Sequence, residues 1–229
     1  MGPYSHYVMA AKLELSIHPE NRNEYYWGAI APDIRYLANM RRDQTHLGQA
    51  QIKELMVCYP ALRSFLLGYQ CHLLCDQVDI TQIVNSAFPF NLLNKIRRKS
   101  FSSQQMIVLV EMFYLQTEIV GVALSGEHNE VFSTLGITAE QTRVFHQALQ
   151  DFFDQRSAEG AMAAFQKIGW IQNKRVEKYM GVYRSMKKQK LLNSLLMLGI
   201  KNARLDSRVI AHVQAVFITQ PNNGKNGNC

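Results

Sequence analysis

His72 and Asp76 are the two residues of this sequence whose types and spacing point most directly to chemistry. They lie four residues apart in the apolar stretch LLGYQCHLLCDQ, residues 66–77. Residues at this spacing share one face of a helix, with Cβ atoms about 5–6 Å apart. An imidazole nitrogen and a carboxylate oxygen could therefore bind one metal ion together. The pair could equally form a buried hydrogen bond that only holds the helix in place, because polar pairs at this spacing are common.

Three side chains upstream could complete a metal site. His6 lies near the start of a predicted first helix, Asp33 follows a proline in GAIAPDI, and His46 follows a polar stretch. Each residue alone has an ordinary explanation, at a helix start, in a turn or on the surface. Their joint order with the later histidine–aspartate pair favours one common site.

Two residues are expected to line the cavity of such a site. Gly68 lies one turn before His72 on the same helix face, where it would leave room for another ligand or for substrate. Trp27 belongs to the aromatic cluster EYYWG, residues 24–28. This cluster could wall the cavity or simply fill the core, which is the usual place for such side chains.

Glu111 and Glu118 are further candidates on a predicted apolar helix. They lie seven residues apart and so share a face. Carboxylates on such a helix are costly to bury unless they are paired or bind a metal. A solvated stripe is the simpler interpretation of the two, and Glu118 is retained as an additional candidate ligand for zinc or iron.

The elements that must position these residues are predicted to be helices. Pro19 limits the first helix, Pro60 opens a long second one, and TAEQ forms a capping box from Thr138. No run with strand alternation and turn signals is present. We therefore expect an all-α, single-domain multi-helix bundle over residues 1–219 and a disordered polar tail over 220–229. The helices are expected over residues 5–17, 60–84, 103–124, 138–153, 157–189, 190–199 and 205–218.

The composition describes a folded, basic protein. Of the 229 residues, 47% are hydrophobic and 19% are charged, which is typical of a globular chain. The net charge of +7 favours anionic partners such as phosphate esters, nucleic acids or lipid surfaces. Basic segments at 94–100 and 173–190 could serve this purpose, although charge runs are usually solvated faces. No nucleic-acid motif accompanies them. We expect a small-molecule or lipid-like anionic substrate, with peripheral membrane contact and no specific nucleic-acid partner.

The cysteines and the chain start favour a cytoplasmic protein. There are four cysteines, of which Cys71 and Cys75 lie on one predicted helix. This is not a disulfide framework, so a reducing compartment is expected. The first residues lack the pattern of a signal peptide, and no apolar run reaches the ~18 residues of a membrane span.

The ordered motifs resemble the zinc-dependent phospholipase C family, which shares its fold with the zinc-dependent single-strand nucleases. They are most similar to its cytoplasmic bacterial branch. The resemblance rests on YSH at 4–6, GAIAPDI at 28–34, His46, and GYQCHLLCD at 68–76. It covers the first third of the chain, and beyond Asp76 only the helical character agrees.

This resemblance implies a role for each of five residues. His46, His72 and Asp76 would hold one metal ion, and Asp76 would bridge to a second ion that His6 helps to hold. Asp33 would be a ligand, or a base beside the reacting water. The implied activity is that of a metal-dependent hydrolase, in which metal-activated water attacks an ester, preferentially a phosphoester.

The chain also departs from the secreted members of that family. Those enzymes use their N-terminal amine as a ligand, which we do not expect from a chain beginning Met1-Gly2. They also hold a third metal through later histidine and glutamate residues, and this chain has no histidine between Asp76 and His128. One or two Zn²⁺ ions are therefore expected, with iron as the alternative metal.

Two other functions remain open at this point. The same site could serve a metalloenzyme of a biosynthetic pathway, acting as a Lewis acid or as a redox iron centre. The identity of the native metal distinguishes this case. Alternatively, the chain could be a non-catalytic helical module that binds anions through its basic face. Binding that survives loss of Asp33 and Asp76 but weakens in salt would indicate such a module.

Overall fold

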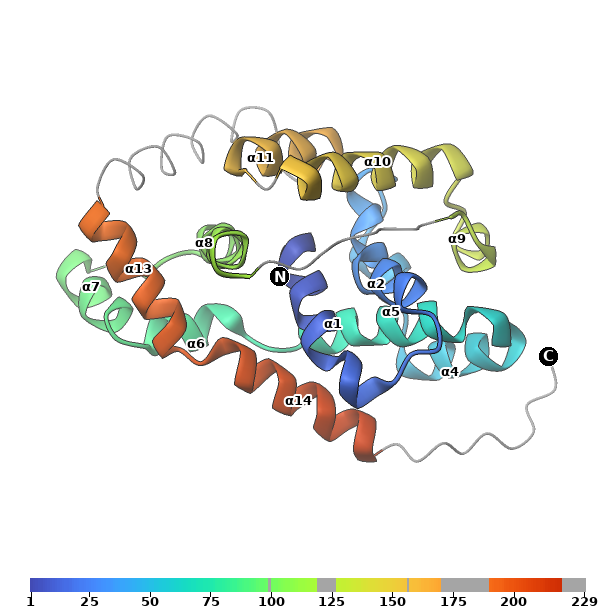
Figure 1. The fold of residues 1–229 in the computed structure, drawn as a ribbon, viewed down its shortest axis with the longest axis horizontal. Coiled ribbons are helices and arrows are strands. Elements are labelled where there is room, and N and C mark those ends of the chain that lie inside the picture. The colour runs from blue at the N-terminus through green and yellow to red at the C-terminus, as the bar shows by residue number, and fades with distance from the viewer. Residues whose placement is uncertain (99, 119–126, 156, 170–189, 220–229) are drawn as a thin grey trace.

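The computed structural model in Figure 1 describes residues 1–98, 100–118, 127–155, 157–169 and 190–219. Every regular element within these ranges is an α-helix or a 3₁₀-helix, so the all-α prediction is confirmed. In chain order they are α1 (Pro3–Ile17), α2 (Arg22–Ile30), η1 (Ala31–Tyr36), α3 (Arg42–Thr45), α4 (Gln49–Cys58), η2 (Pro60–Leu62), α5 (Arg63–Cys75), α6 (Ile80–Ser86), α7 (Phe90–Arg97), α8 (Ser103–Thr117), α9 (Glu130–Thr134), α10 (Ala139–Gln155), α11 (Ala158–Lys167), α13 (Lys190–Asn202) and α14 (Leu205–Thr219).

Helices α2 and α5 pack backbone to backbone through a pair of glycines. A Cβ atom at Gly28 would overlap the carbonyl oxygen of Phe65, and one at Gly68 would overlap the carbonyl oxygen of Tyr25. Glycine is the residue that permits such a close approach. The expectation that Gly68 leaves room for a ligand is therefore wrong, because the backbone of α2 fills that space.

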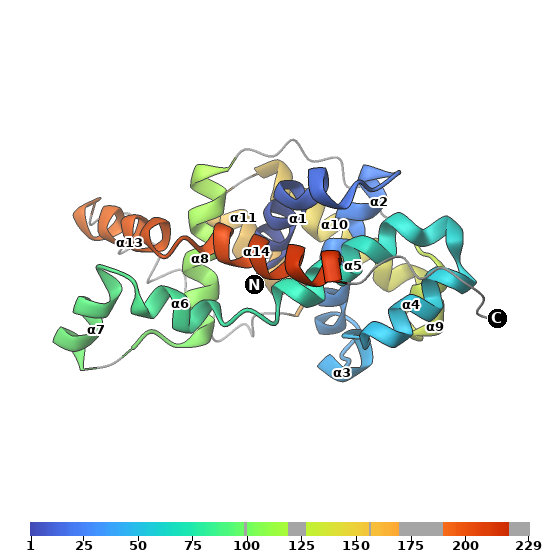
Figure 2. The same ribbon diagram turned by 90° about the horizontal axis from the view of Figure 1, so that it is seen from below.

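Helix α1 lies against this pair and against α8 and α14, as Figures 1 and 2 show. Its first half is buried, which places His6 deep in the molecule. Trp27 is also fully buried, and it packs against Phe132 of α9 and Phe145 of α10. It fills the core between these helices, so the prediction that it lines the substrate cavity is not supported.

The long helix predicted over 60–84 is interrupted, which is a correction to the sequence prediction. Helix α5 ends at Cys75, and α6 begins after Asp79, whose side chain accepts a hydrogen bond of 2.9 Å from Gln82 N. Aspartate is a preferred N-cap, so a new helix begins there in place of the old one continuing. The interruption leaves Asp76 at the end of α5.

Helices α1, α8, α10, α11, α13 and α14 lie where helices were predicted. Helices α2, α4, α7 and α9 lie in segments for which no helix was predicted. The capping box at Thr138 is present, since Gln141 N and the Thr138 hydroxyl group are paired at 3.2 Å. Helix α8 is shorter than predicted, because Glu118 has an extended backbone. Residues 119–126, 170–189 and 220–229 lie outside the described ranges, as do most of the second basic segment and the predicted tail. The division into one domain and a tail stays a prediction. Within the described part of the chain, no helix has both the length and the apolar character that a membrane crossing requires.

The glycine contact between α2 and α5 can be tested by adding one methyl group. We expect Gly68→Ala to lower the free energy of unfolding by about 2–3 kcal/mol, because the added atom forces two backbones apart. Gly48→Ala is the control, since its new Cβ would have only Gln51 Oε1 nearby, at 3.5 Å. It should cost less than about 1 kcal/mol. Urea denaturation measures both, and equal stability of the two variants would refute the close contact.

Candidate metal centre

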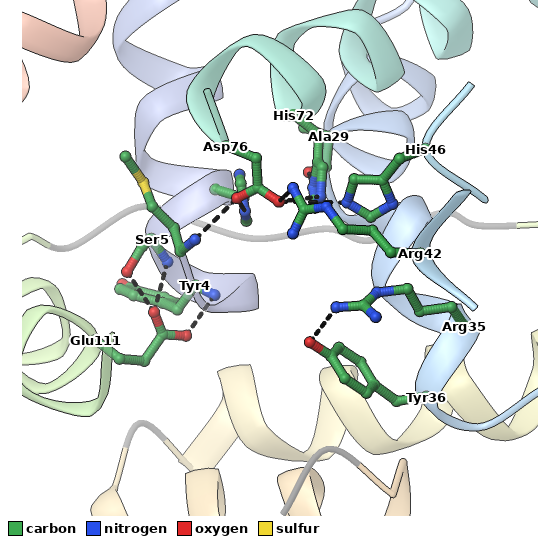
Figure 3. Close-up of polar contacts among 12 residues, drawn as sticks. Tyr4, Ser5, Ala29, Arg35, Tyr36, Arg42, His46, His72, Asp76 and Glu111 are labelled. Atoms are coloured by element: carbon green, nitrogen blue, oxygen red, sulfur yellow. Dashed lines mark hydrogen bonds and ion pairs between the residues drawn. The ribbon is translucent and has the colours of Figure 1, made fainter. Parts of the chain in front are cut away.

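The structure brings together all five residues that the sequence analysis assigned to a metal site. They come from separate elements that meet at the C-terminal end of α5, as the close-up in Figure 3 shows for the labelled members. His6 lies on α1, Asp33 on η1, His46 directly after α3, His72 on α5, and Asp76 at the end of α5.

One oxygen of Asp76 faces the beginning of the chain. Its Oδ1 atom lies 2.9 Å from the α-amino nitrogen of Met1 and 3.2 Å from Nε2 of His6. The amino group and the imidazole of His6 are both buried. Among the described residues, the ion pairs on this side of the carboxylate therefore come from α1 and the residues before it.

The other oxygen of Asp76 faces a second set of nitrogens. Its Oδ2 atom lies 3.3 Å from Nε2 of His46, 3.6 Å from Nε2 of His72, and 2.7 Å from Nη2 of Arg42. The two oxygens thus face different histidines. A carboxylate in this position can bridge two cations, with one on each oxygen.

The ring of His72 is held in a defined orientation. Its Nδ1 atom lies 2.9 Å from the carbonyl oxygen of Ala29 on α2. A carbonyl accepts only, so Nδ1 donates this hydrogen bond, and Nε2 is the ring atom that faces Asp76. Metal-binding histidines are usually oriented by such a second hydrogen bond. The ring also stacks on His6, with the ring centroids 3.7 Å apart.

Several polar atoms of this cluster are buried without a hydrogen bond among the described residues. They are both ring nitrogens of His6, Nε2 of His72 and Oδ2 of Asp33. Buried polar atoms in folded proteins are nearly always bonded, so these atoms are available for a ligand. Two sets of three residues have ligand atoms within 4.8 Å of one another: His6, Asp33 and His72, and His46, His72 and Asp76. Imidazole and carboxylate donors so arranged suit zinc.

Burial sets the protonation states that a metal would require. Burial lowers the pKa of His6 well below its usual value, and the nearby His72 and Met1 ammonium group lower it further. Burial also lowers the pKa of His46. Both rings are therefore neutral near pH 7, the form that binds metals. Burial opposes the ionisation of Asp76, but the Met1 ammonium group and His6 outweigh it and hold its pKa below the usual range.

The pKa of Asp33 is shifted in the opposite direction to that of Asp76. Burial raises the pKa of Asp33, an effect strengthened by the Asp76 charge and opposed by His72. Its Oδ2 atom has no hydrogen bond among the described residues, and a raised pKa makes a carboxylate a better proton acceptor. The structure thus places two aspartates in one cluster with different environments, a feature often found where acid–base chemistry occurs.

The structure adds two groups that the sequence analysis did not assign to the site. The amino group of Met1 was not expected as a ligand, yet it contacts Asp76, and this contact raises its pKa despite burial. Arg42 was not considered, because an arginine at the start of a short helix carries no distinguishing signal. Its side chain is 53% exposed, so it links Asp76 to solvent.

Arg35 also lies near the cluster. Its guanidinium carbon lies 3.9 Å over the ring of Tyr36, and it donates a hydrogen bond to the hydroxyl group of that tyrosine. Figure 3 shows Arg35 and Arg42 on the opposite side of Asp76 from Glu111. The Nε atom of Arg35 is buried without a hydrogen bond among the described residues. Two cationic side chains therefore flank this side of the cluster.

Glu111 anchors the helix that carries His6. It is buried, and it accepts hydrogen bonds from Tyr4 N at 2.7 Å and Ser5 N at 3.0 Å, and another from the Ser5 hydroxyl group. These backbone groups belong to the first turn of α1, where no partner exists within the helix. The solvated stripe predicted for Glu111 is therefore wrong. Glu118 is half-exposed and pairs with Lys12 at 2.8 Å, so the structure does not bring it into either set of candidate ligands.

One comparison with known families matched part of the chain. Residues 5–78 match the family described as zinc dependent phospholipase C, so the resemblance found in the sequence is confirmed over the first third of the chain. All five predicted ligands lie within the matched segment. No curated protein and no solved structure matched the chain.

The buried position of Glu111 predicts a pH-dependent stability. Burial raises its pKa to about 7 from the usual 4.5, so the unfolded chain releases this proton at lower pH than the folded chain. The stabilisation is complete below the unfolded pKa and is lost as the pH rises through the folded one, by up to about 3 kcal/mol. Glu111→Gln cannot titrate. Relative to this variant, the wild type should lose stability between about pH 5 and pH 8 in urea denaturation.

The control for this measurement is Glu54→Gln, since Glu54 is exposed on α4. Its unfolding free energy should follow the pH dependence of the wild type. Parallel curves for the wild type and Glu111→Gln would show that Glu111 has an ordinary pKa in the folded protein.

Proposed function

Because residues 5–78 match the zinc-dependent phospholipase C family and gather its histidines and aspartates in one place, we propose that this protein is a zinc-dependent hydrolase that cleaves a phosphoester. The observation that carries the proposal is the position of Asp76. Its two oxygens face two different groups of nitrogens, as expected of a carboxylate shared between two metal positions.

The residues would divide between these two positions. His46, His72 and Asp76 would hold one zinc ion, and His6 would hold a second together with the other oxygen of Asp76. When bound, zinc would supply a water activated near neutral pH and a Lewis acid for the phosphoryl oxygens. The neutral imidazoles and the ionised Asp76 already have the protonation states that such binding requires.

Asp33 is the residue that we assign to proton transfer. It lies within 4.8 Å of ligand atoms of His6 and His72, and its Oδ2 atom has no hydrogen bond among the described residues. Its raised pKa makes it a better proton acceptor than an ordinary aspartate. In this role it would take a proton from the attacking water at Oδ2 and later release it.

Arg42 and Arg35 are suited to binding the anionic substrate. Arg42 now neutralises Asp76, and a cation at this carboxylate would replace that interaction. Its guanidinium group would then be available to a phosphate, with which arginine forms paired hydrogen bonds. These two cationic side chains favour a small-molecule or lipid-like anionic substrate over a neutral ester.

The cytoplasmic location remains a proposal. Cys71 and Cys75 are free thiols, and both are buried in α5. Cys58 of α4, by contrast, is disulfide-bonded, so the cysteines as a set do not favour a reducing compartment.

The metal assignment can be tested by elemental analysis of the purified protein. We expect zinc in the wild type and a loss of at least half of it in His72→Ala, since Nε2 of His72 belongs to both candidate ligand sets. The control is His18→Asn, because His18 is exposed and lies beyond the end of α1. This variant should keep its zinc. Full metal content in His72→Ala would refute the site, and iron in place of zinc would favour a redox or Lewis-acid enzyme.

The hydrolytic role can be tested with Asp33→Asn. The amide cannot accept a proton, so we expect kcat on a chromogenic phosphodiester to fall by about 10²–10⁴-fold. Zinc content should change little if Asp33 acts mainly as a base. An inactive wild type that nevertheless holds zinc would refute phosphoester hydrolysis, and full activity in Asp33→Asn would refute the assignment of the base.

A further inference from the structure

An exposed apolar face lies around α7, away from the metal centre. Three large side chains of this face are exposed to solvent: Phe88 by 55%, Leu92 by 49% and Ile96 by 71%. They follow one another at intervals of four residues, so the two on α7 share one side of the helix. Exposed large apolar side chains that gather in one place usually mark a contact surface.

The opposite side of α7 is fixed to the rest of the molecule. Phe90 is fully buried and packs edge-on against Phe101, with ring centroids 5.4 Å apart. It also lies against Gly199 of α13, where a Cβ atom would overlap its ring. Asn202 of α13 donates a hydrogen bond of 3.2 Å to the carbonyl oxygen of Phe88. The packing of Phe90 and the hydrogen bond to Phe88 therefore fix α7 with its apolar face towards solvent.

Exposed cationic side chains lie close to the apolar face in the sequence and on the neighbouring helix α13. Lys95 and Arg98 are exposed on and after α7, and Lys201 is exposed on α13. Between Asp79 and Glu111 the sequence contains no Asp or Glu but four Lys or Arg residues. This segment thus supplies +4 of the net charge of +7.

We propose that this α7 surface, made of Phe88, Leu92 and Ile96 with the cationic rim of Lys95 and Arg98, docks the protein onto an anionic lipid bilayer. Amphipathic helices with apolar side chains on one face and Lys or Arg beside them bind at the boundary between headgroups and acyl chains. The absence of acidic residues in the segment complements negatively charged headgroups. Figures 1 and 2 both show α7 with α6 and α13 at one end of the molecule.

The surface functions independently of the metal centre. None of its residues belongs to either set of candidate ligands. Docking would bring the molecule to an interface rich in phosphoesters, but binding itself requires no hydrolysis. Vesicle binding by protein stripped of metal with a chelator is therefore expected to equal that of untreated protein, so that this inference and the proposed activity can fail separately.

The test is co-sedimentation with vesicles of phosphatidylcholine alone and of phosphatidylcholine mixed with phosphatidylglycerol. We expect the wild type to bind the mixed vesicles, and to bind less in high salt because the charges are screened. The double variant Leu92→Ser/Ile96→Ser should bind at least about tenfold more weakly, since two apolar side chains no longer enter the bilayer. Lys95→Gln should weaken binding about fivefold.

The matched control is Leu15→Ser, because Leu15 is 78% exposed but lies on α1. It should bind vesicles as the wild type does. Thermal unfolding of all variants should match the wild type, since the altered side chains are exposed. Failure of the wild type to bind mixed vesicles, or equal binding by the double variant, would overturn the inference. A dimer that these two substitutions dissociate, without vesicle binding, would assign the surface to a second copy of this chain.

Discussion

The buried carboxylate of Asp76 is the charge on which the arrangement of the first eighty residues depends. A carboxylate removed from water is strongly destabilising unless cations and hydrogen-bond donors surround it. Here the donors come from the chain start, from α1, from α3 and the residue directly after it, and from α5 itself. Removing Asp76 would leave the buried Met1 ammonium group without its partner. The need to satisfy this one group therefore brings separate segments of the chain to one place.

A second layer of contacts fixes the positions of the ligands themselves. The carbonyl group of Ala29 orients His72, and it can do so only because Gly28 and Gly68 allow α2 to touch α5. Glu111 performs the same task for His6 by holding the first turn of α1. These contacts lie on packed helices rather than on exposed loops. Such support is what a metal site requires if its geometry is to persist before a metal binds.

The sequence predicted the longer helices, such as α1, α10 and α14, and the five candidate ligands because these features are local or ordered along the chain. It missed the shorter helices α2, α4, α7 and α9. The periodicity of α1 and the capping box at Thr138 depend only on neighbouring residues. By contrast, the contact that fills the space beside Gly68 and the role of Glu111 involve partners far away in the sequence. Composition and spacing contain no signal for such contacts. The end of α5 was also missed, because the N-cap at Asp79 competes with an apolar pattern that continues on both sides of it.

The charge distribution differs between the metal cluster and the α7 surface, the two parts of the protein proposed to contact other molecules. Within the metal cluster the carboxylates of Asp33 and Asp76 face cationic groups, so little net charge remains there. The excess positive charge of the chain lies elsewhere, and more than half of it lies in the acid-free segment between Asp79 and Glu111. A basic composition and a histidine–aspartate motif therefore describe different parts of this molecule. The first concerns where the protein binds, and the second concerns what it does there, so substitutions on α7 and in the cluster should affect different measurements.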